Sequence, residues 1–253
     1  MEPSALLAPL LADPATAGVF CDFDGTLSPI VDDPATARPY PGVRAALGDL
    51  AARYAVVGVV SGRPVDFLEP LVPDEVVVSG LYGLEQLHRG VRTDLDGGGN
   101  WREVIEHVAA ASRSHGPAGM LVEPKGLSLT LHFRTHPELA DEVDSWARLQ
   151  ASRSGLSVRA ARMSVELHPP VAADKGTAID VLAAGLATVL YIGDDLGDLP
   201  AYAALDRLAA AASTTSVKVA VASDEAPADL LAAADLVVDG PAGALDLLRS
   251  LAA

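Results

Sequence analysis

The chain has 253 residues, half of them hydrophobic, and a formal net charge of −16 at pH 7. This length can bury one large core or two smaller ones, and the negative charge argues against nucleic acid or an anionic membrane as a partner. The single cysteine, Cys21, excludes an internal disulfide. Because the N-terminus lacks a basic region and no apolar run reaches the length of a membrane span, we expect no export signal and a cytoplasmic protein. Separately, we expect the protein to be a monomer.

Two carboxylates follow the first predicted strand. The apolar run Val19–Cys21 is typical of a buried strand, and Asp22-Phe23-Asp24-Gly25-Thr26 comes directly after it. Two acids, two positions apart at a strand end, suit one nucleophile beside one general acid/base. Their oxygens also suit a hard divalent cation. Acidic residues are common in turns, so the pair gains its meaning from the segments that follow.

Three later segments present polar side chains in comparable positions. The apolar, β-branched run 55–60 ends in Ser61-Gly62-Arg63. Further on, Asp174-Lys175-Gly176-Thr177 opens a predicted helix with Asp174 as its N-cap. The apolar run 189–192 then ends in Gly193-Asp194-Asp195-Leu196-Gly197-Asp198. Apolar strands that end in functional side chains and alternate with helices predict an open parallel α/β sheet, which binds ligands at the carboxyl ends of its strands.

The middle of the chain has a different pattern. It lies between a Gly-rich stretch at 96–100 and a Pro pair at 169–170, both suited to act as hinges. A helix, a hairpin, a second helix and a second hairpin are predicted there in turn, over 101–114, 120–134, 137–153 and 156–168. We therefore expect a small α+β cap at 96–169, inserted into a catalytic core of 1–95 and 170–253 and closing over the substrate.

In their order along the chain, the four polar segments resemble the motifs of the haloacid dehalogenase superfamily of aspartate-nucleophile phosphotransferases. The resemblance implies a Rossmann-like α/β core with a parallel sheet. It implies Asp22 as the nucleophile and Asp24 as the general acid/base. Ser61 matches the phosphate-binding hydroxyl and Lys175 the lysine that neutralises the phosphate. For a Mg²⁺ ion it implies Asp22, the main-chain carbonyl of Asp24 and Asp194, with Asp195 and Asp198 close by.

Further stretches resemble one family within that superfamily, the trehalose-6-phosphate phosphatases. They are Phe23 to Ile30, Gly80-Leu81-Tyr82-Gly83-Leu84-Glu85, Glu123-Pro124-Lys125 with His132-Phe133-Arg134, Met163 to Pro169, and Asp194 to Asp198. Tyr82 stands where the family usually has His, and His168 where Arg is more typical. Tyr82 bears on the choice of sugar and His168 on closure of the cap, and neither touches the four core motifs.

The resemblance implies that Glu123, Lys125 and Glu166 bind the hydroxyls of the disaccharide. Lys125 is one of only three lysines in the chain. Because arginine is used at most other basic positions, a lysine here indicates a function for its compact ammonium charge. Glu123 and Glu166 also fit ordinary exposed strand residues. We further expect substrate contacts from Gly62, Arg63, Gly83 and Glu85. An ion pair is an equally good interpretation of Arg63, and Glu85 equally fits a residue that follows a turn.

Three functions compete. The favoured one is Mg²⁺-dependent hydrolysis of trehalose 6-phosphate to trehalose and phosphate, through an aspartyl-phosphate. The second is another capped sugar phosphatase, acting for example on sucrose phosphate or mannosyl-phosphoglycerate. The third is a non-catalytic regulator that binds a sugar phosphate on the same fold. The regulator is disfavoured because all five core residues are present: Asp22, Asp24, Ser61, Lys175 and Asp194.

Overall fold

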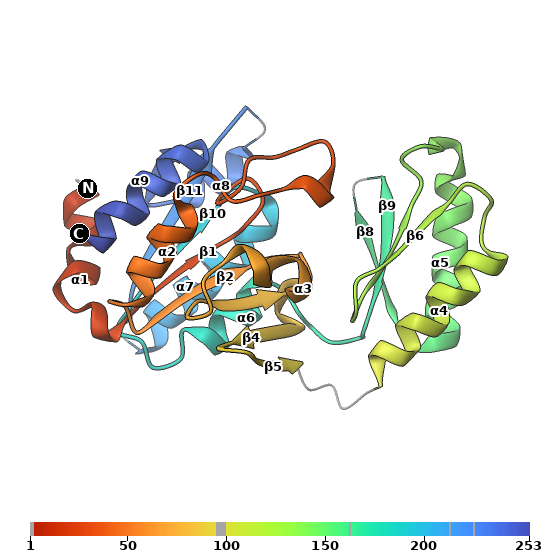
Figure 1. Ribbon diagram of the computed structural model, residues 1–253, viewed down its shortest axis with the longest axis horizontal. Helices are drawn as coiled ribbons and strands as arrows, with labels where there is room; N and C mark the ends of the chain where they lie inside the picture. The colour runs from red at the N-terminus through yellow and green to blue at the C-terminus, as the bar shows by residue number, and fades with distance from the viewer. Residues whose placement is uncertain (1–2, 95–99, 162, 213, 225) are drawn as a thin grey trace. The chain divides into compact units, whose positions relative to one another are not determined.

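A computed structural model describes residues 3–94, 100–161, 163–212, 214–224 and 226–253. The chain divides into two units, one formed by Met1–Asp94 with Ala173–Ala253 and the other by Leu95–Ala172 (Figure 1). Apart from Asn100, the stretch at 96–100 that was predicted as a hinge lies outside the described residues.

The larger unit, called the core unit here, contains an eight-stranded sheet in the order β12-β11-β10-β1-β2-β3-β4-β5. Its parallel strands are β1 (Ala17–Cys21), β2 (Val56–Val60), β3 (Val77–Gly80), β10 (Thr188–Gly193), β11 (Thr215–Ala222) and β12 (Leu236–Asp239). Two short antiparallel strands, β4 (Glu85–His88) and β5 (Val91–Asp94), extend one edge. The predicted α/β fold with an open parallel sheet is therefore confirmed, with an antiparallel addition that the sequence analysis did not include.

Helices cover both faces of this sheet (Figure 1). Val19 and Cys21 of β1 pack with residues of α1 (Pro3–Ala12), α2 (Val43–Ala51) and α9 (Gly240–Ala252). Phe20, between them, packs on the other face with residues of α6 (Lys175–Leu182), α7 (Leu199–Ala212) and α8 (Ala228–Ala233). Since successive side chains of a strand point to opposite faces, burial on both sides explains why the central strands are apolar throughout.

Short elements complete the core unit. They are α3 (Val65–Leu68) and the 3₁₀ turns η1 (Pro14–Thr16), η2 (Pro34–Thr36), η3 (Glu69–Leu71), η4 (Leu81–Gly83) and η6 (Leu196–Asp198). The start of α6 is fixed by a reciprocal cap. The Asp174 carboxylate accepts from the main-chain N–H of Thr177 (2.7 Å), and the Thr177 hydroxyl accepts from that of Asp174 (3.0 Å). The predicted N-cap is confirmed, and Lys175 is the first residue of the helix.

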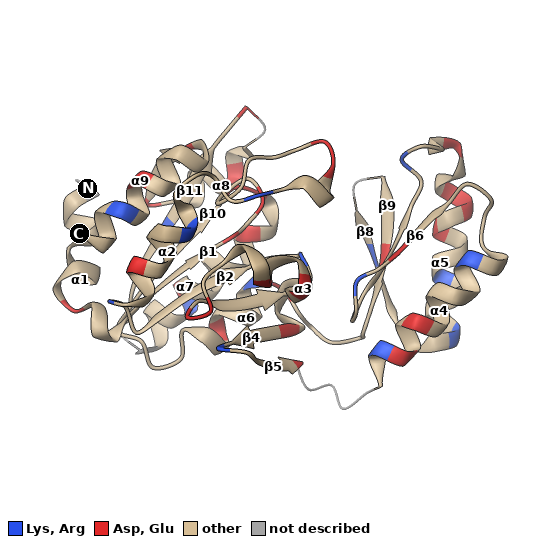
Figure 2. Ribbon diagram, in the orientation of Figure 1, with Lys and Arg blue, Asp and Glu red and all other residues tan. Residues whose placement is uncertain are grey.

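The smaller unit, called the inserted unit, has a four-stranded antiparallel sheet in the order β6-β7-β9-β8. Its elements are α4 (Trp101–His115), β6 (Leu121–Pro124), β7 (Leu129–His132), η5 (Pro137–Leu139), α5 (Ala140–Ser154), β8 (Ser157–Ala161) and β9 (Ser164–His168). Leu129, Leu131, Val165 and Leu167 form one core with residues of both helices, including Ile105. The helices also carry charged residues of both signs (Figure 2), as expected where one side of a helix meets water.

Candidate active site

Three polar segments meet at the carboxyl edge of the core sheet. The strands β2, β1 and β10 are neighbours and run parallel, so the residues after each of them emerge at the same edge. The main-chain N–H of Asp22 still donates to the carbonyl of Ile192 (2.9 Å), and that of Ser61 to the carbonyl of Ser79 (2.9 Å). The sheet thus holds the backbone of these two residues in place one position beyond the strand ends.

A lysine and two aspartates form the buried centre of this edge. The ammonium of Lys175 lies 3.0 Å from Asp22 Oδ1 and 2.7 Å from Asp198 Oδ1. The side chains of Lys175 and Asp198 are 3% and 0% exposed. Buried charges are stable only when they are paired and hydrogen-bonded. The capped start of α6 therefore places the positive charge of Lys175 between Asp22 and Asp198, where it stabilises their negative charge.

Asp198 acts as a hub that accepts four hydrogen bonds. Its Oδ1 accepts from Lys175 Nζ (2.7 Å) and from the Tyr191 hydroxyl (2.7 Å). Its Oδ2 accepts from the main-chain N–H groups of Asp194 (2.9 Å) and Asp195 (3.1 Å). One carboxylate thus fixes both the lysine and the backbone that carries the next acids.

The acids of this cluster outnumber the cations, and their pKa values reflect it. Burial raises the pKa of Asp22 well above its usual range, Lys175 opposes the rise, and the neighbouring carboxylates add to it: Asp198, Asp194 and Asp195. The pKa of Asp194 is raised to about 7, mainly by burial and then by Asp198. For Lys175, burial acts to lower the pKa, but Asp198 and Asp22 outweigh it, and the pKa is raised well above its usual value. Lys175 is therefore charged, but its single positive charge does not balance the negative charge that the neighbouring aspartates would carry when ionised.

Asp194 is held against the turn that follows Asp24. Its Oδ1 accepts from the hydroxyl of Thr26 (3.0 Å), which is fully buried. Gly25 has φ +78°, and a Cβ there would lie 1.9 Å from Asp194 Oδ2. Only glycine allows this approach, because it has no side chain and tolerates a positive φ.

A divalent metal ion fits this cluster. Asp22, Asp194 and Asp198 each offer a carboxylate oxygen, and these oxygens lie within 4.8 Å of one another. Oxygen ligands are those that Mg²⁺ prefers, and a doubly charged cation would supply the missing compensation. Because Asp198 already accepts four hydrogen bonds, Asp22 and Asp194 are the better-suited pair. Asp195, predicted as a further ligand, is 62% exposed and instead caps η6 through Gly197 (2.8 Å).

Asp24, the predicted acid/base, is in a bidentate ion pair with Arg63. Arg63 Nε lies 2.7 Å from Asp24 Oδ2, and Arg63 Nη2 lies 2.8 Å from Asp24 Oδ1. The guanidinium also donates to the carbonyl of Pro34 (2.8 Å) and stacks on the ring of Phe67, 4.5 Å from its centroid. Of the two interpretations left open for Arg63, the structure shows the ion pair, and its partner is a predicted catalytic residue.

The loop after β2 packs closely against η4. A Cβ on Gly62 would lie 2.6 Å from the ring of Tyr82, and the main-chain N–H of Tyr82 donates to the carbonyl of Ser61 (3.0 Å). Glu85 is buried and accepts from the main-chain N–H of Val65 (3.0 Å). Gly83, also predicted to contact substrate, lies beside Ala178 of α6. These contacts fix the backbone around Ser61, whose Oγ accepts from the N–H of Arg63 (3.2 Å).

The inserted unit carries a polar row across one face of its sheet. In register, Glu123 of β6 pairs with Thr130, Thr130 with Glu166, and Glu166 with Arg159 of β8. Paired residues share a face, which here is the one opposite the leucines packed on the helices. Two of the three predicted sugar-binding residues, Glu123 and Glu166, thus lie on one surface.

Glu123 is held by two cationic or polar neighbours. His132 Nε2 lies 2.7 Å from Glu123 Oε2, and Lys125 Nζ lies 3.4 Å from the same oxygen. The hydrogen bond from His132 is the main cause that lowers the pKa of Glu123, burial opposes it, and Lys125 adds to the lowering. Glu123 is therefore an ionised acceptor at neutral pH, and its side chain is 48% exposed.

Two residues in these clusters, Tyr191 and His132, were given no role in the site by the sequence analysis. Tyr191 lies in an apolar strand, where a tyrosine hydroxyl needs a partner, and this need was the available signal. His132 lies two positions after Thr130 on the face that Thr130 shares with Glu123. Alternation along the strand would have placed it there.

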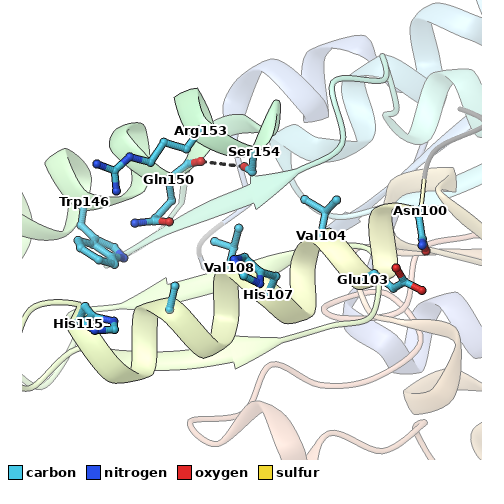
Figure 3. Close-up of a pocket in the computed structure, with 11 residues that line it drawn as sticks. Asn100, Glu103, Val104, His107, Val108, His115, Trp146, Gln150, Arg153 and Ser154 are labelled. Atoms are coloured by element: carbon cyan, nitrogen blue, oxygen red, sulfur yellow. Dashed lines mark hydrogen bonds between the residues drawn. The ribbon is translucent and has the colours of Figure 1, made fainter.

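A separate groove lies between the helices of the inserted unit (Figure 3). Its volume is about 970 Å³, and His107, His115, Trp146 and Arg153 are among the side chains on its walls. Trp146 Nε1 donates to the hydroxyl of Ser112 (3.0 Å), and the Ser154 hydroxyl donates to the carbonyl of Gln150 (2.8 Å). Among the described residues that line it, none is a predicted catalytic or substrate-binding residue.

Comparisons with known proteins show the family of this chain. A sequence profile of the trehalose-phosphatase family matches residues 20–234. The trehalose-phosphate phosphatase of Mycobacterium leprae (strain TN) is 35% identical over 222 residues, which cover 80% of this chain and 52% of that protein. The chain thus spans about half the length of the mycobacterial trehalose-phosphate phosphatases that it matches.

Two solved structures have the same fold. A trehalose-6-phosphate phosphatase related protein is similar with a TM-score of 0.74 at 22% identity, over 93% of this chain and 96% of that chain. The C-terminal domain of the Candida albicans trehalose synthase regulatory protein is similar with a TM-score of 0.68 at 15% identity, over 99% of this chain and 98% of that chain. Since the family profile covers most of its length, this chain belongs to the trehalose-phosphatase family.

Proposed function

We propose that the chain is a Mg²⁺-dependent phosphatase that hydrolyses trehalose 6-phosphate to trehalose and phosphate. The observation that carries the proposal is the buried Lys175 between Asp22 and Asp198, with Asp194 beside them. A phosphate monoester dianion repels nucleophiles, so its hydrolysis depends on positioning and on neutralised charge. This cluster offers a fixed carboxylate nucleophile together with the cation that the phosphoryl group needs.

In the first half of the reaction, Asp22 attacks phosphorus and forms an aspartyl-phosphate. Lys175, held by Asp198, stays charged and binds a phosphoryl oxygen beside the nucleophile. The Ser61 hydroxyl, on a loop fixed by Tyr82 and Glu85, binds a second phosphoryl oxygen. These groups orient the phosphoryl group for in-line attack.

Asp24 serves both halves of the reaction through proton transfer. It donates a proton to the sugar oxygen as that oxygen leaves, and then takes a proton from the water that attacks the aspartyl-phosphate. In the structure both of its oxygens accept hydrogen bonds from Arg63. Water attack returns Asp22 as a free carboxylate and releases inorganic phosphate.

The metal ion would be held by Asp22 and Asp194, together with the main-chain carbonyl of Asp24 that the family resemblance implies. When bound, Mg²⁺ supplies positive charge that brings an anionic nucleophile and an anionic substrate together. The raised pKa values of both aspartates support this assignment, because burial and like charges at present oppose their ionisation.

For the substrate, we propose that Glu123, Lys125 and Glu166 of the inserted unit bind the hydroxyls of the disaccharide. A sugar offers many hydroxyl donors and little apolar surface, so ionised acceptors such as Glu123 suit it. The pairing of Glu166 with both Thr130 and Arg159 across the sheet gives that acid fixed neighbours for the same task. The family membership supports trehalose 6-phosphate over other sugar phosphates.

A phosphate-release panel tests the proposal. Purified protein with Mg²⁺ is given trehalose 6-phosphate, sucrose phosphate, mannosyl-phosphoglycerate and glucose 6-phosphate. We expect the highest kcat/KM for trehalose 6-phosphate and no activity in excess chelator, with recovery on adding Mg²⁺. A preference for another member of the panel would reassign the substrate within the same chemistry. Binding of sugar phosphate without any phosphate release would favour the regulator.

A further inference from the structure

The ion pair with Arg63 engages both oxygens of Asp24, the predicted acid/base. Both carboxylate oxygens accept from the guanidinium, at 2.7 and 2.8 Å. Each oxygen keeps a second lone pair, but the two bonds hold the carboxylate in an orientation that faces the guanidinium. We expect proton transfer to a leaving group to need Asp24 to turn away from Arg63, so that the pair opens during turnover.

The pair is also placed where it can open. The side chains of Arg63 and Asp24 are 20% and 32% exposed, whereas those of Lys175 and Asp198 are 3% and 0% exposed. Partly exposed ion pairs contribute little to stability, so a stronger anion can replace the carboxylate at modest cost. A phosphoryl group is such an anion, since it carries up to two charges and accepts bidentate bonds from arginine.

Arg63 lies next to Ser61, whose hydroxyl is the proposed phosphate-binding group. Its main-chain N–H donates to the Oγ of Ser61 (3.2 Å), and its carbonyl accepts from Leu81 (3.0 Å), so the backbone is fixed there. Only the side chain has to change partner. Its anchors besides Asp24 include the carbonyl of Pro34 and the face of Phe67, which itself packs edge-on against Phe23.

The excess of negative charge in the core cluster favours moving Arg63 from Asp24 to a bound phosphoryl group. Asp22, Asp194, Asp195 and Asp198 can together carry more negative charge than Lys175 and a divalent cation offset, so an incoming dianion gains from a further positive charge. Moving Arg63 onto the phosphoryl group adds one positive charge to the bound substrate. The same movement leaves Asp24 without its partner at the moment when its proton transfer is needed.

We propose that Arg63 is exchanged between Asp24 and the phosphoryl group of the substrate. In the substrate-free protein it holds Asp24 inactive, and when a phosphate ester binds it transfers to phosphoryl oxygens and releases Asp24. The proposal rests on the phosphatase function proposed above. It makes Arg63 a phosphate-binding residue that couples substrate binding to the availability of the acid/base.

Binding of inorganic phosphate, measured by calorimetry in the presence of Mg²⁺, tests the exchange without turnover. In the proposed exchange, the Asp24 carboxylate competes with phosphate for the guanidinium of Arg63. Asp24→Asn removes the charge of this carboxylate, so phosphate should bind about three- to tenfold more tightly. Arg63→Gln removes a charged hydrogen-bond partner, so phosphate should bind about tenfold more weakly. In the double variant, Asp24→Asn should bring no further tightening relative to Arg63→Gln. Arg207→Gln, which removes a surface pair with Asp180, is the matched control and should bind phosphate like the wild type.

The double variant separates exchange from simple charge removal. If Asp24→Asn tightens phosphate binding equally with and without Arg63, the effect is electrostatic and the exchange is overturned. A second measurement, by NMR, uses the wild-type protein and tests directly whether Arg63 changes its partner. The ¹⁵N–¹H signal of Arg63 Nε, assigned by its loss in Arg63→Lys, should shift when phosphate saturates the wild-type protein.

Phosphate binding that leaves the Arg63 Nε signal unmoved would also overturn the proposal. The phosphatase function is tested independently by the substrate panel. Hydrolysis of sugar phosphates without exchange would remove only the role of Arg63. Exchange without hydrolysis would retain Arg63 as a phosphate-binding residue and remove the phosphatase function.

Discussion

Each of the two units holds a cluster that pairs one lysine with acidic side chains or a single glutamate, and the two clusters differ in their balance of charge. Around Lys175 in the core unit, buried aspartates outnumber the cations, and the pKa values of Asp22 and Asp194 are raised. In the inserted unit, Lys125 and His132 both contact the half-exposed carboxylate of Glu123, and the pKa of Glu123 is lowered. The first cluster needs added positive charge, while the second is already balanced.

This difference matches the two tasks proposed for the chain. A metal ion and the chemistry of a dianion fit a cluster that lacks positive charge and excludes water. Neutral hydroxyl groups fit a cluster whose carboxylate is ionised before the ligand arrives. The comparison predicts that changes in the core cluster abolish chemistry or stability, and that changes in the inserted unit alter the choice of substrate.

The largest effect is expected for the nucleophile. Asp22→Asn is close in shape to the wild type, but an amide does not form the aspartyl-phosphate, so turnover should fall by at least about a thousandfold. Phosphate release from trehalose 6-phosphate measures the loss, and circular dichroism checks the fold. Asp180→Asn, at a surface pair on α6, is the control and should retain nearly full activity. Activity of Asp22→Asn above about a per cent of wild type would contradict the mechanism.

The next effect concerns the hub of the core cluster. All four partners of Asp198 are donors, so in Asp198→Asn the amide NH₂ must face a donor in either orientation. We expect the free energy of unfolding in urea to fall by about 3–5 kcal/mol. The exposed pair of Lys218 with Asp206 (2.8 Å) is the matched control, and Asp206→Asn should cost about 0–1 kcal/mol. Similar losses for the two variants would mean that burial of the hub adds nothing.

The third effect concerns the inserted unit. Glu123→Gln, Lys125→Met and Glu166→Gln should each lower kcat/KM for trehalose 6-phosphate by roughly ten- to a hundredfold, because each loses a charged hydrogen bond. An aryl phosphate has no disaccharide, so its hydrolysis should change little. Glu103→Gln, on an exposed position of α4, is the control within the same unit. Equal losses on both substrates would assign these residues to structure, and no loss on either would remove them from substrate binding.

The sequence predicted the sheet and the inserted unit because their signals are local. Apolar β-branched runs identify the buried strands, and the change to alternation with helices identifies the insertion. The Asp174 cap was also readable, since an acid three positions before a threonine at a helix start is a local pattern. The predicted parallel strands lack β4 and β5, which are short and only partly apolar.

The sequence could not show which side chains pair at the site. Arg63 and Asp24 are 39 positions apart, and only the neighbouring positions of β1 and β2 in the sheet bring them together. The same holds for Tyr191 and Lys175, which meet on Asp198 from a strand and a helix. Residue types were enough to suggest roles, but the partner of each charge depends on tertiary contacts.

The smallest effect is a dependence of stability on pH in the protein without metal. An unfolded aspartate has a pKa near 3.9, whereas that of Asp194 is raised to about 7 in the fold. Between about pH 4 and pH 7 the folded state therefore binds more protons than the unfolded state, and its stability falls as the pH rises. We expect the Tm to drop by a few degrees between pH 5 and pH 7.5.

His168 acts in the opposite sense, because burial lowers its pKa and so favours the fold at higher pH. The contribution of Asp194 is isolated by comparison with Asp194→Asn, which keeps His168. At pH 7.5 without Mg²⁺ this variant should melt at a higher temperature than the wild type, since it removes an uncompensated charge. Adding Mg²⁺ should raise the Tm of the wild type more at pH 7.5 than at pH 5, and should barely change that of the variant. If Mg²⁺ stabilised both proteins equally, Asp194 would not belong to the metal site, and the core cluster would lack the feature that distinguishes it from the cluster around Glu123.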